Sequence, residues 1–226
     1  MLATILVYIR CLYINTKFRI RMVNNMKLIC ITGDSGSGKT TVAKKIQEFL
    51  PHSLLIHADD YMKNWVKHNI AECQRIFNIS QETVGFNECR LLCCNTTLEQ
   101  FRKFIATVTP FVEKDVEKII SLQKNGRYSY AIIEWAGLCN FKIWNRADYR
   151  ITIKTQESMR IKNLTKKMVA SGRYNDNAIK VRTVPDPDNH KISLNPSFII
   201  ENNYDDNLYL NIQSVCSSII SQETDA

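Results

Sequence analysis

Residues 33–41 constrain the fold of this 226-residue chain more than any other stretch, because they combine three glycines with a lysine and several hydroxyl side chains. They read Gly-Asp-Ser-Gly-Ser-Gly-Lys-Thr-Thr and follow a short apolar run at residues 28–32. A strand, a glycine-rich turn and the start of a helix together direct several backbone N–H groups at one anion. Glycine is needed in the turn because a Cβ atom there would keep the backbone from approaching the anion. The pattern therefore predicts a phosphate-binding loop.

Every position of this loop is expected to contact a bound nucleotide. Lys39 is expected to reach the outer phosphates and the Thr40 hydroxyl to bind Mg²⁺, while the helix that begins near Lys39 adds its positive end. The alternative is a glycine-rich turn without a ligand. It is less favoured because three of the seven glycines of the chain lie in this one loop. The predicted nucleotide-binding positions are Gly33, Asp34, Ser35, Gly36, Ser37, Gly38, Lys39, Thr40 and Thr41.

Strand-like and helix-like segments alternate along the chain, which predicts one α/β domain at residues 26–226 with a doubly wound parallel sheet. Within it we expect a helical segment on the acceptor side at residues 62–126 and a basic lid at residues 156–191. Strands are expected at residues 28–32, 53–57, 129–134, 149–154 and 197–200. Helices are expected at residues 41–50, 97–108, 110–125, 156–170, 177–184 and 205–220.

Acidic residues follow two of the predicted strands. Asp59 and Asp60 come after the strand at residues 53–57, and Glu134 ends the strand at residues 129–134. Because the carboxyl ends of parallel strands border the ligand crevice, these acids are expected near the phosphates. Asp59 is the preferred general base and Asp60 the expected helix cap. Asp59 and Glu134 are also expected, with Thr40, at the Mg²⁺ site; the alternative for Glu134 is a structural salt bridge.

A strongly basic segment extends from residue 156 to residue 173 and includes Lys162, Lys166 and Lys167. Arg160 and Arg173 are expected to close over the phosphates, because a guanidinium offers a bidentate fork that an ammonium lacks. The alternative is a solvated basic face. With this segment, the chain has a phosphate cradle, a Mg²⁺ site, an acid and cations, which are the components of phosphoryl transfer.

The net charge of +8 is unevenly distributed. Residues 1–25 carry +4 and residues 154–191 carry +5, so the remainder carries about −1. A nucleic-acid surface would spread its basic residues along one face, so nucleic acid is not an expected partner.

The first 25 residues are interpreted as an N-terminal extension, disordered or the product of an upstream start. Their apolar stretch at residues 2–14 is interrupted by Arg10 and is too short to span a bilayer, so no transmembrane segment is expected. An interfacial or organelle-targeting helix is the alternative.

The eight cysteines are expected to be reduced thiols, which favours a cytoplasmic protein. Cys89, Cys93 and Cys94 have helical spacing without a Cys-x-x-Cys partner or a nearby pair of histidines, so buried small side chains are favoured over a zinc site.

Several motifs together resemble the uridine kinase and nicotinamide riboside kinase group of small-molecule phosphate-loop kinases. The resemblance covers about residues 27–167 and rests on the loop, Asp-Asp-Tyr at 59–61, Ile-Ile-Glu at 132–134 and Ile-Trp-Asn-Arg at 143–146. It implies the three-layer α/β/α fold of P-loop NTPases, with ATP and Mg²⁺ as cofactors. It also implies that Asp59 is the base, that Glu134 assists at Mg²⁺ and that Arg160 holds phosphates.

The C-terminal third resembles dephospho-CoA kinases, in which an apolar strand ending in Asn lies near the adenine; here Asn202 has that place. Three departures leave the acceptor open. Trp135 stands where uridine kinases usually have Gly, residues 85–87 lack the acid and His that recognise the nucleoside, and the lid has fewer arginines.

The sequence therefore predicts an ATP- and Mg²⁺-dependent phosphotransferase that moves the γ-phosphoryl to a hydroxyl of a small nucleoside-like or cofactor-precursor acceptor. The alternatives are a dephospho-CoA kinase-like enzyme, a kinase of nucleic-acid 5′ ends, and a nucleotide-binding interaction module without transfer activity. The choice between ATP and GTP stays open, and the sequence carries no signal for the oligomeric state.

Overall fold

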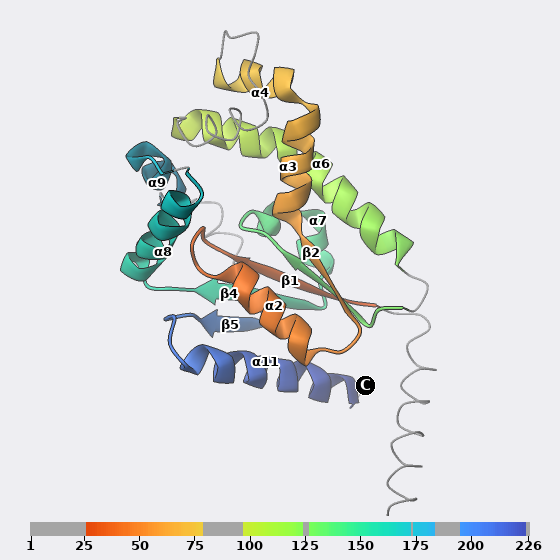
Figure 1. Cartoon of the computed structure of the whole chain (residues 1–226). Helices are drawn as coiled ribbons and strands as arrows, with labels where there is room; N and C mark the ends of the chain where they lie inside the picture. Colours follow the sequence, from red (N-terminus) through yellow and green to blue (C-terminus); the bar gives the residue numbers. More distant parts are fainter. Residues whose placement is uncertain (1–25, 79–96, 124–126, 173, 184–194, 225–226) are drawn as a thin grey trace, which may run out of the picture.

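The computed structural model describes residues 26–78, 97–123, 127–172, 174–183 and 195–224, which form a parallel sheet covered by helices (Figure 1). The strand order is β2-β3-β1-β4-β5, and every neighbouring pair is parallel. The strands are β1 (Lys27–Gly33), β2 (Ser53–His57), β3 (Tyr130–Glu134), β4 (Tyr149–Lys154) and β5 (Phe198–Glu201). The prediction of a parallel α/β sheet is confirmed.

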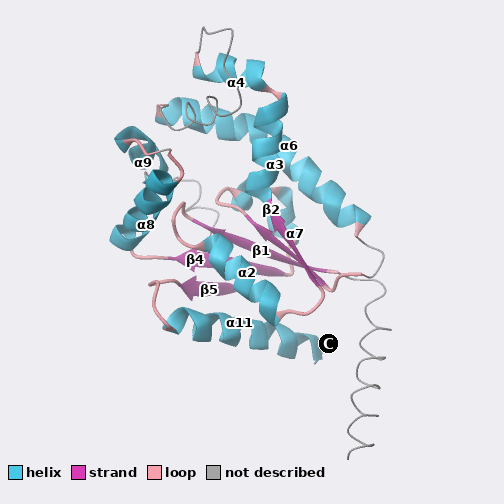
Figure 2. Ribbon diagram, viewed as in Figure 1, coloured by secondary structure: helices cyan, strands magenta, loops and turns pink. Residues whose placement is uncertain are grey.

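Two helical layers enclose the sheet (Figure 2). Ile29 and Ile31 of β1 point to the core under α2 (Lys39–Phe49) and α11 (Asn207–Thr224), whereas Leu28 and Cys30 point to the opposite core, as alternation along a strand requires. The elements of the second layer are α3 (Ala58–His68), α4 (Ile70–Phe77), α6 (Leu98–Leu122), the 3₁₀ helix η1 (Leu138–Asn140) and α7 (Lys142–Arg146).

The helices α8 (Glu157–Ala170) and α9 (Asp176–Thr183) follow β4 and lie beside the carboxyl end of the sheet (Figure 1). They pack on each other through a small separate core of Leu164, Met168 and Ala178. This pair lies on the opposite side of the loop from α3, α4 and α6 and forms the described part of residues 156–191, the range expected to act as a lid.

The expected pair of helices at residues 97–108 and 110–125 is wrong, because α6 is one 25-residue helix that contains Pro110. A capping box between Thr97 and Gln100 starts it. A buried stripe with four-residue spacing then continues through the proline: Phe104, Val108, Val112, Val116 and Ile120. Burial along the whole stripe outweighs the roughly 3 kcal/mol that a proline costs inside a helix.

The other element boundaries agree with expectation to within a few residues; α2 begins at Lys39 rather than at Thr41. Several expectations lie outside the described residues: those on residues 1–25, residues 85–87, Arg173 and the cysteines at positions 89, 93 and 94. No helix in the described ranges is long and apolar enough to cross a membrane.

Replacement of Pro110 by alanine is expected to raise the free energy of unfolding by about 1–3 kcal/mol, because it restores a helical N–H and removes a steric clash. Urea denaturation measures the change. Pro51→Ala, in the exposed turn after α2, is the control and should bring no gain. A loss of stability in Pro110→Ala would show that the fold needs the proline.

Candidate active site

The loop between β1 and α2 lies at the carboxyl edge of the sheet, and two of its glycines adopt left-handed backbone conformations. Gly36 has φ of +87° and Gly38 has φ of +85°. A Cβ at Gly36 would lie 2.7 Å from the carbonyl oxygen of Arg160, and one at Gly38 would collide with the side-chain amide of Asn202. These glycines are therefore required by the contacts of the loop with α8 and with the end of β5, in addition to any ligand.

The carbonyl groups of the loop are bound by side chains from outside it. The Asn202 amide donates to the carbonyl of Ser37 over 2.8 Å, and the Tyr204 hydroxyl donates to the carbonyl of Gly36. Arg160 donates from Nη1 to the carbonyl of Ser35 over 3.3 Å. The Ser37 N–H donates to the carbonyl of Asp34 over 3.1 Å, and the other N–H groups at residues 34–38 have no backbone acceptor within the described residues, so they are available to an anion.

The backbone N–H groups at the N-terminus of α2 are also available to a ligand. Gly38 is its N-cap residue, no side chain within the described residues caps it, and its first turn carries no acid. The first N–H groups of a helix have no intrahelical partner and carry the positive end of the helix dipole. This end of α2 is therefore an anion-binding position.

Lys39 lies in the first turn of α2, and its side chain is buried against the loop. Its Nζ donates to the carbonyl oxygen of Asp34 over 2.8 Å. Burial lowers the pKa of Lys39 below its ordinary value, while the carboxylates of Glu134, Asp59 and Asp34 partly oppose this effect. A phosphate group at the loop would compensate the buried charge.

Glu134, the last residue of β3, is buried and joins two other side chains. Its Oε1 accepts a hydrogen bond from the Thr40 hydroxyl over 3.2 Å and lies 2.8 Å from Nδ1 of His57. A threonine hydroxyl that donates its proton keeps its lone pairs for a cation. The sequence-based site does not include His57, although the signal was present: His57 and Glu134 end two predicted strands that turn out to be neighbours.

The adjacent pair Asp59 and Asp60 divides as expected, with one member in the site. Asp59 lies in the first turn of α3 and lines the main cavity. The carboxylate of Asp60 is 62% exposed and lies 2.6 Å from Nζ of Lys63. The expectation that Asp60 caps the helix is wrong, since α3 has no side-chain cap and Asp60 forms an ion pair instead.

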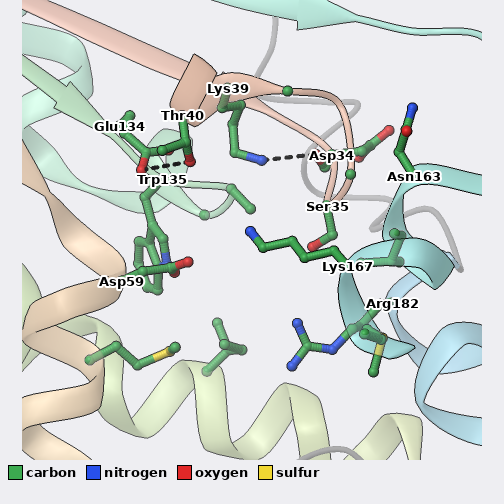
Figure 3. Close-up of a pocket in the computed structure, with 18 of the residues that line it drawn as sticks. Asp34, Ser35, Lys39, Thr40, Asp59, Glu134, Trp135, Asn163, Lys167 and Arg182 are labelled. Carbon is green, nitrogen blue, oxygen red and sulfur yellow. Dashed lines mark hydrogen bonds between the residues drawn. The ribbon is translucent and has the colours of Figure 1, made fainter. Parts of the chain in front are cut away.

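A cavity of about 490 Å³ brings most of the predicted site together (Figure 3). Its polar wall includes Asp34, Ser35, Gly36, Gly38, Lys39, Thr40, Thr41, Asp59, Lys63, Asn140, Asn163, Tyr204 and Glu134. Its apolar wall includes Met62, Val66, Phe101, Phe104, Ile105 and Trp135. Lys167 of α8 and Arg182 of α9 extend into it from the side opposite Asp59.

Four predicted residues lie elsewhere. Gly33, Ser37 and Arg160 line a smaller cavity of about 350 Å³ rather than the main one, and Asn202 holds the loop from outside. Arg160 differs most from expectation, because its buried guanidinium joins the carbonyl of Ser35 to that of Thr183 at the end of α9. Apolar periodicity and charge do not reveal which cation of a basic helix faces inward.

The donor set fits Mg²⁺. Thr40, Asp59 and Glu134 offer hydroxyl and carboxylate oxygens, which are the ligands this ion prefers. In the part of the chain that the structure describes, no three His, Cys, Asp or Glu side chains form a metal-binding group of their own. Mg²⁺ usually takes one or two carboxylates together with phosphate oxygens of the substrate.

Comparison with curated proteins finds a short match, and no family model matches the chain. The uridine kinase of Borreliella burgdorferi is 58% identical over 38 residues, which is 17% of this chain and 18% of that protein. The uridine kinase of Borrelia hermsii is 51% identical over 39 residues. The match thus spans less than a fifth of the curated relatives' length.

Comparison with solved structures covers nearly the whole chain. TT1252 from Thermus thermophilus has a TM-score of 0.61 at 18% identity, covering 88% of this chain and 98% of that one. Shikimate kinase from Acinetobacter baumannii, in complex with shikimate, has a TM-score of 0.51 at 13% identity, covering 88% and 96%. The chain therefore shares the α/β fold of these two structures.

Replacement of Lys39 by methionine is expected to stabilise the ligand-free protein at neutral pH and to remove any stabilisation by ATP. Because the pKa of Lys39 is lowered in the folded state, the unfolded chain binds more protons between that pKa and the ordinary value of 10.5. The wild type should therefore gain stability from this group as pH rises through that window, and the variant should lack this gain.

Thermal unfolding between pH 7 and pH 10, with and without ATP, measures both effects. Lys44→Met, an exposed position on the same helix, is the matched control and should behave like the wild type. If the stability of Lys39→Met and that of the wild type changed equally with pH, the lowered pKa of Lys39 would be contradicted.

Proposed function

We propose that this protein is a Mg²⁺-dependent kinase that transfers the γ-phosphoryl group of ATP to a hydroxyl of a small, nucleoside-like acceptor, as in the uridine kinase group. One observation carries the proposal: the open N-terminus of α2, the buried Lys39 and the Thr40–Glu134 pair border the same cavity as Asp59. The short match to uridine kinases supports it.

The phosphate loop has the role of binding and orienting the nucleotide. Its N–H groups and the ammonium of Lys39 hold the β- and γ-phosphates, and the Thr40 hydroxyl and Glu134 hold Mg²⁺. The ion, when bound, neutralises charge on the phosphate oxygens. Correct placement of two reactants can by itself lower a barrier by about 7–11 kcal/mol, so most of the catalysis is assigned to geometry.

Asp59 has the role of general base. The acceptor oxygen forms a bond to the γ-phosphorus, the bond from that phosphorus to the leaving ADP oxygen breaks, and the hydroxyl proton passes to the Asp59 carboxylate. The position of Asp59 across the cavity from the lid, and the exposure and ion pair of Asp60, favour this choice.

Lys167 and Arg182 supply the cations over the transferred group. Both line the cavity from the lid helices, whereas the guanidinium of Arg160 is occupied by backbone carbonyls. In this proposal Arg160 shapes the loop instead of binding phosphate directly.

The apolar wall has the role of receiving the acceptor. The half-buried side chains of Met62, Phe101 and Ile105 lie in this wall over the buried Trp135 and Phe104, which suits the flat part of a nucleoside-like molecule. We place the reaction in the cytoplasm, where ATP is available and thiols stay reduced.

The adjacent aspartates provide the test. Asp59→Asn should lower turnover of the best acceptor from a nucleoside and cofactor-precursor panel by about 100-fold or more, because it removes the base. ATP affinity should remain within a few-fold of the wild type. Asp60→Asn is the matched control and should keep nearly full turnover, since Asp60 does not line the cavity and its exposed carboxylate pairs with Lys63.

Coupled ADP release and ³¹P NMR of the product measure these rates. Retained turnover in Asp59→Asn would exclude that residue as base. Tight ATP binding with no transfer to any acceptor would instead favour the nucleotide-binding interaction module.

A further inference from the structure

His57 does not line the main cavity, but it contacts Glu134, which does, and the phosphoryl-transfer steps give it no role. It is the last residue of β2, and its side chain is about one quarter exposed. Its Nδ1 lies 2.8 Å from Oε1 of Glu134. Its partner is therefore the acid assigned to the Mg²⁺ side of the site.

The chemistry of the pair determines which atom carries the proton. An ionised carboxylate only accepts hydrogen bonds, so Nδ1 of His57 is the donor. The same Oε1 also accepts the proton of the Thr40 hydroxyl. Both hydrogen bonds to Glu134 within the described residues thus use one oxygen, which leaves Oε2 for the cation and its water.

Backbone geometry makes this arrangement rigid. In the parallel pairing of β2 with β3, His57 and Glu134 are direct register partners. His57 is also the N-cap residue of α3, which carries Asp59 two residues later. The imidazole is therefore held against Glu134 by a residue whose backbone leads directly into the turn that carries Asp59.

The ammonium of Lys39 competes with His57 for the carboxylate of Glu134. Its carboxylate is the strongest electrostatic partner of the buried Lys39 ammonium, which is assigned to the phosphates. A Glu134 side chain without a fixed hydrogen bond on the β2 side would be drawn toward that ammonium, and both groups would be less available to the nucleotide and its cation.

We propose that His57 is a positioning residue that holds the Glu134 carboxylate with Oε2 toward Mg²⁺. The proposal rests on the proposed function, because it assumes that Glu134 serves a nucleotide-bound cation. Groups that hold a metal-binding carboxylate typically affect metal affinity by 10–100-fold when they are removed.

The test uses the full chain with ADP and Mn²⁺, whose free concentration is read by electron paramagnetic resonance, so no acceptor is needed. His57→Ala should weaken Mn²⁺ binding to the protein–ADP complex by about 10-fold. ADP affinity without the metal should be unchanged. His57→Asn should stay within about 3-fold of the wild type, because its amide nitrogen takes the place of Nδ1.

Two further variants keep the result interpretable. His57→Gln has a polarity similar to that of His57→Asn, but its amide lies one bond further from the backbone. It should therefore bind Mn²⁺ as weakly as His57→Ala. It takes the place of His57→Ala in the test if His57→Ala does not fold. His52→Asn, at an exposed left-handed position before β2, is the control and should match the wild type.

The two levels of the proposal fail differently. Equal Mn²⁺ affinity in the wild type, His57→Ala and His57→Gln would overturn the role of His57 and leave the kinase proposal standing. Absence of ADP and Mn²⁺–ADP binding in the wild type would overturn both.

Discussion

The central position of β3 between β1 and β2 is the constraint on which the candidate site depends. Its parallel register places Glu134 opposite Ile31 of β1 on one side and His57 of β2 on the other. β1 leads directly into the loop, and β2 leads directly into the first turn of α3 with Asp59. A shift of one residue in this register would turn Glu134 to the opposite face and separate it from Thr40.

The loop is a second rigid unit, held by residues that follow β4 and β5. Side chains of Arg160, Asn202, Tyr204 and Thr155 bind its carbonyl groups, and Lys39 binds one from within. The loop thus keeps its shape through hydrogen bonds on one side and offers N–H groups and a buried ammonium on the other. Such preorganisation lowers the cost of binding, because few groups have to be ordered when a ligand arrives.

Much of this arrangement could be predicted from the sequence. The glycine-rich loop, the buried strands and the acids at strand ends each follow from local patterns, and the parallel fold follows from their alternation. The convergence of Lys39, Thr40, Asp59 and Glu134 on one cavity needs only the rule that parallel strands end at the same edge.

The remaining features depend on long-range packing. Pro110 marks a helix end in local terms, but the continuous apolar stripe of α6, buried in the core that it shares with α3 and α4, keeps the helix intact. The inward direction of Lys167 and Arg182, and the occupation of Arg160 by carbonyls, depend on how α8 meets the loop. His57 becomes a partner of Glu134 only once β2 and β3 are known to be neighbours.

The measurement that most directly tests the account is a crystal structure of the protein with Mg²⁺ and a non-hydrolysable ATP analogue. The account predicts β- and γ-phosphate oxygens within hydrogen-bonding distance of Nζ of Lys39 and of the first N–H groups of α2. It also predicts the cation beside the Thr40 hydroxyl. A triphosphate bound away from the loop, or a nucleotide whose phosphates do not contact Lys39, would contradict it.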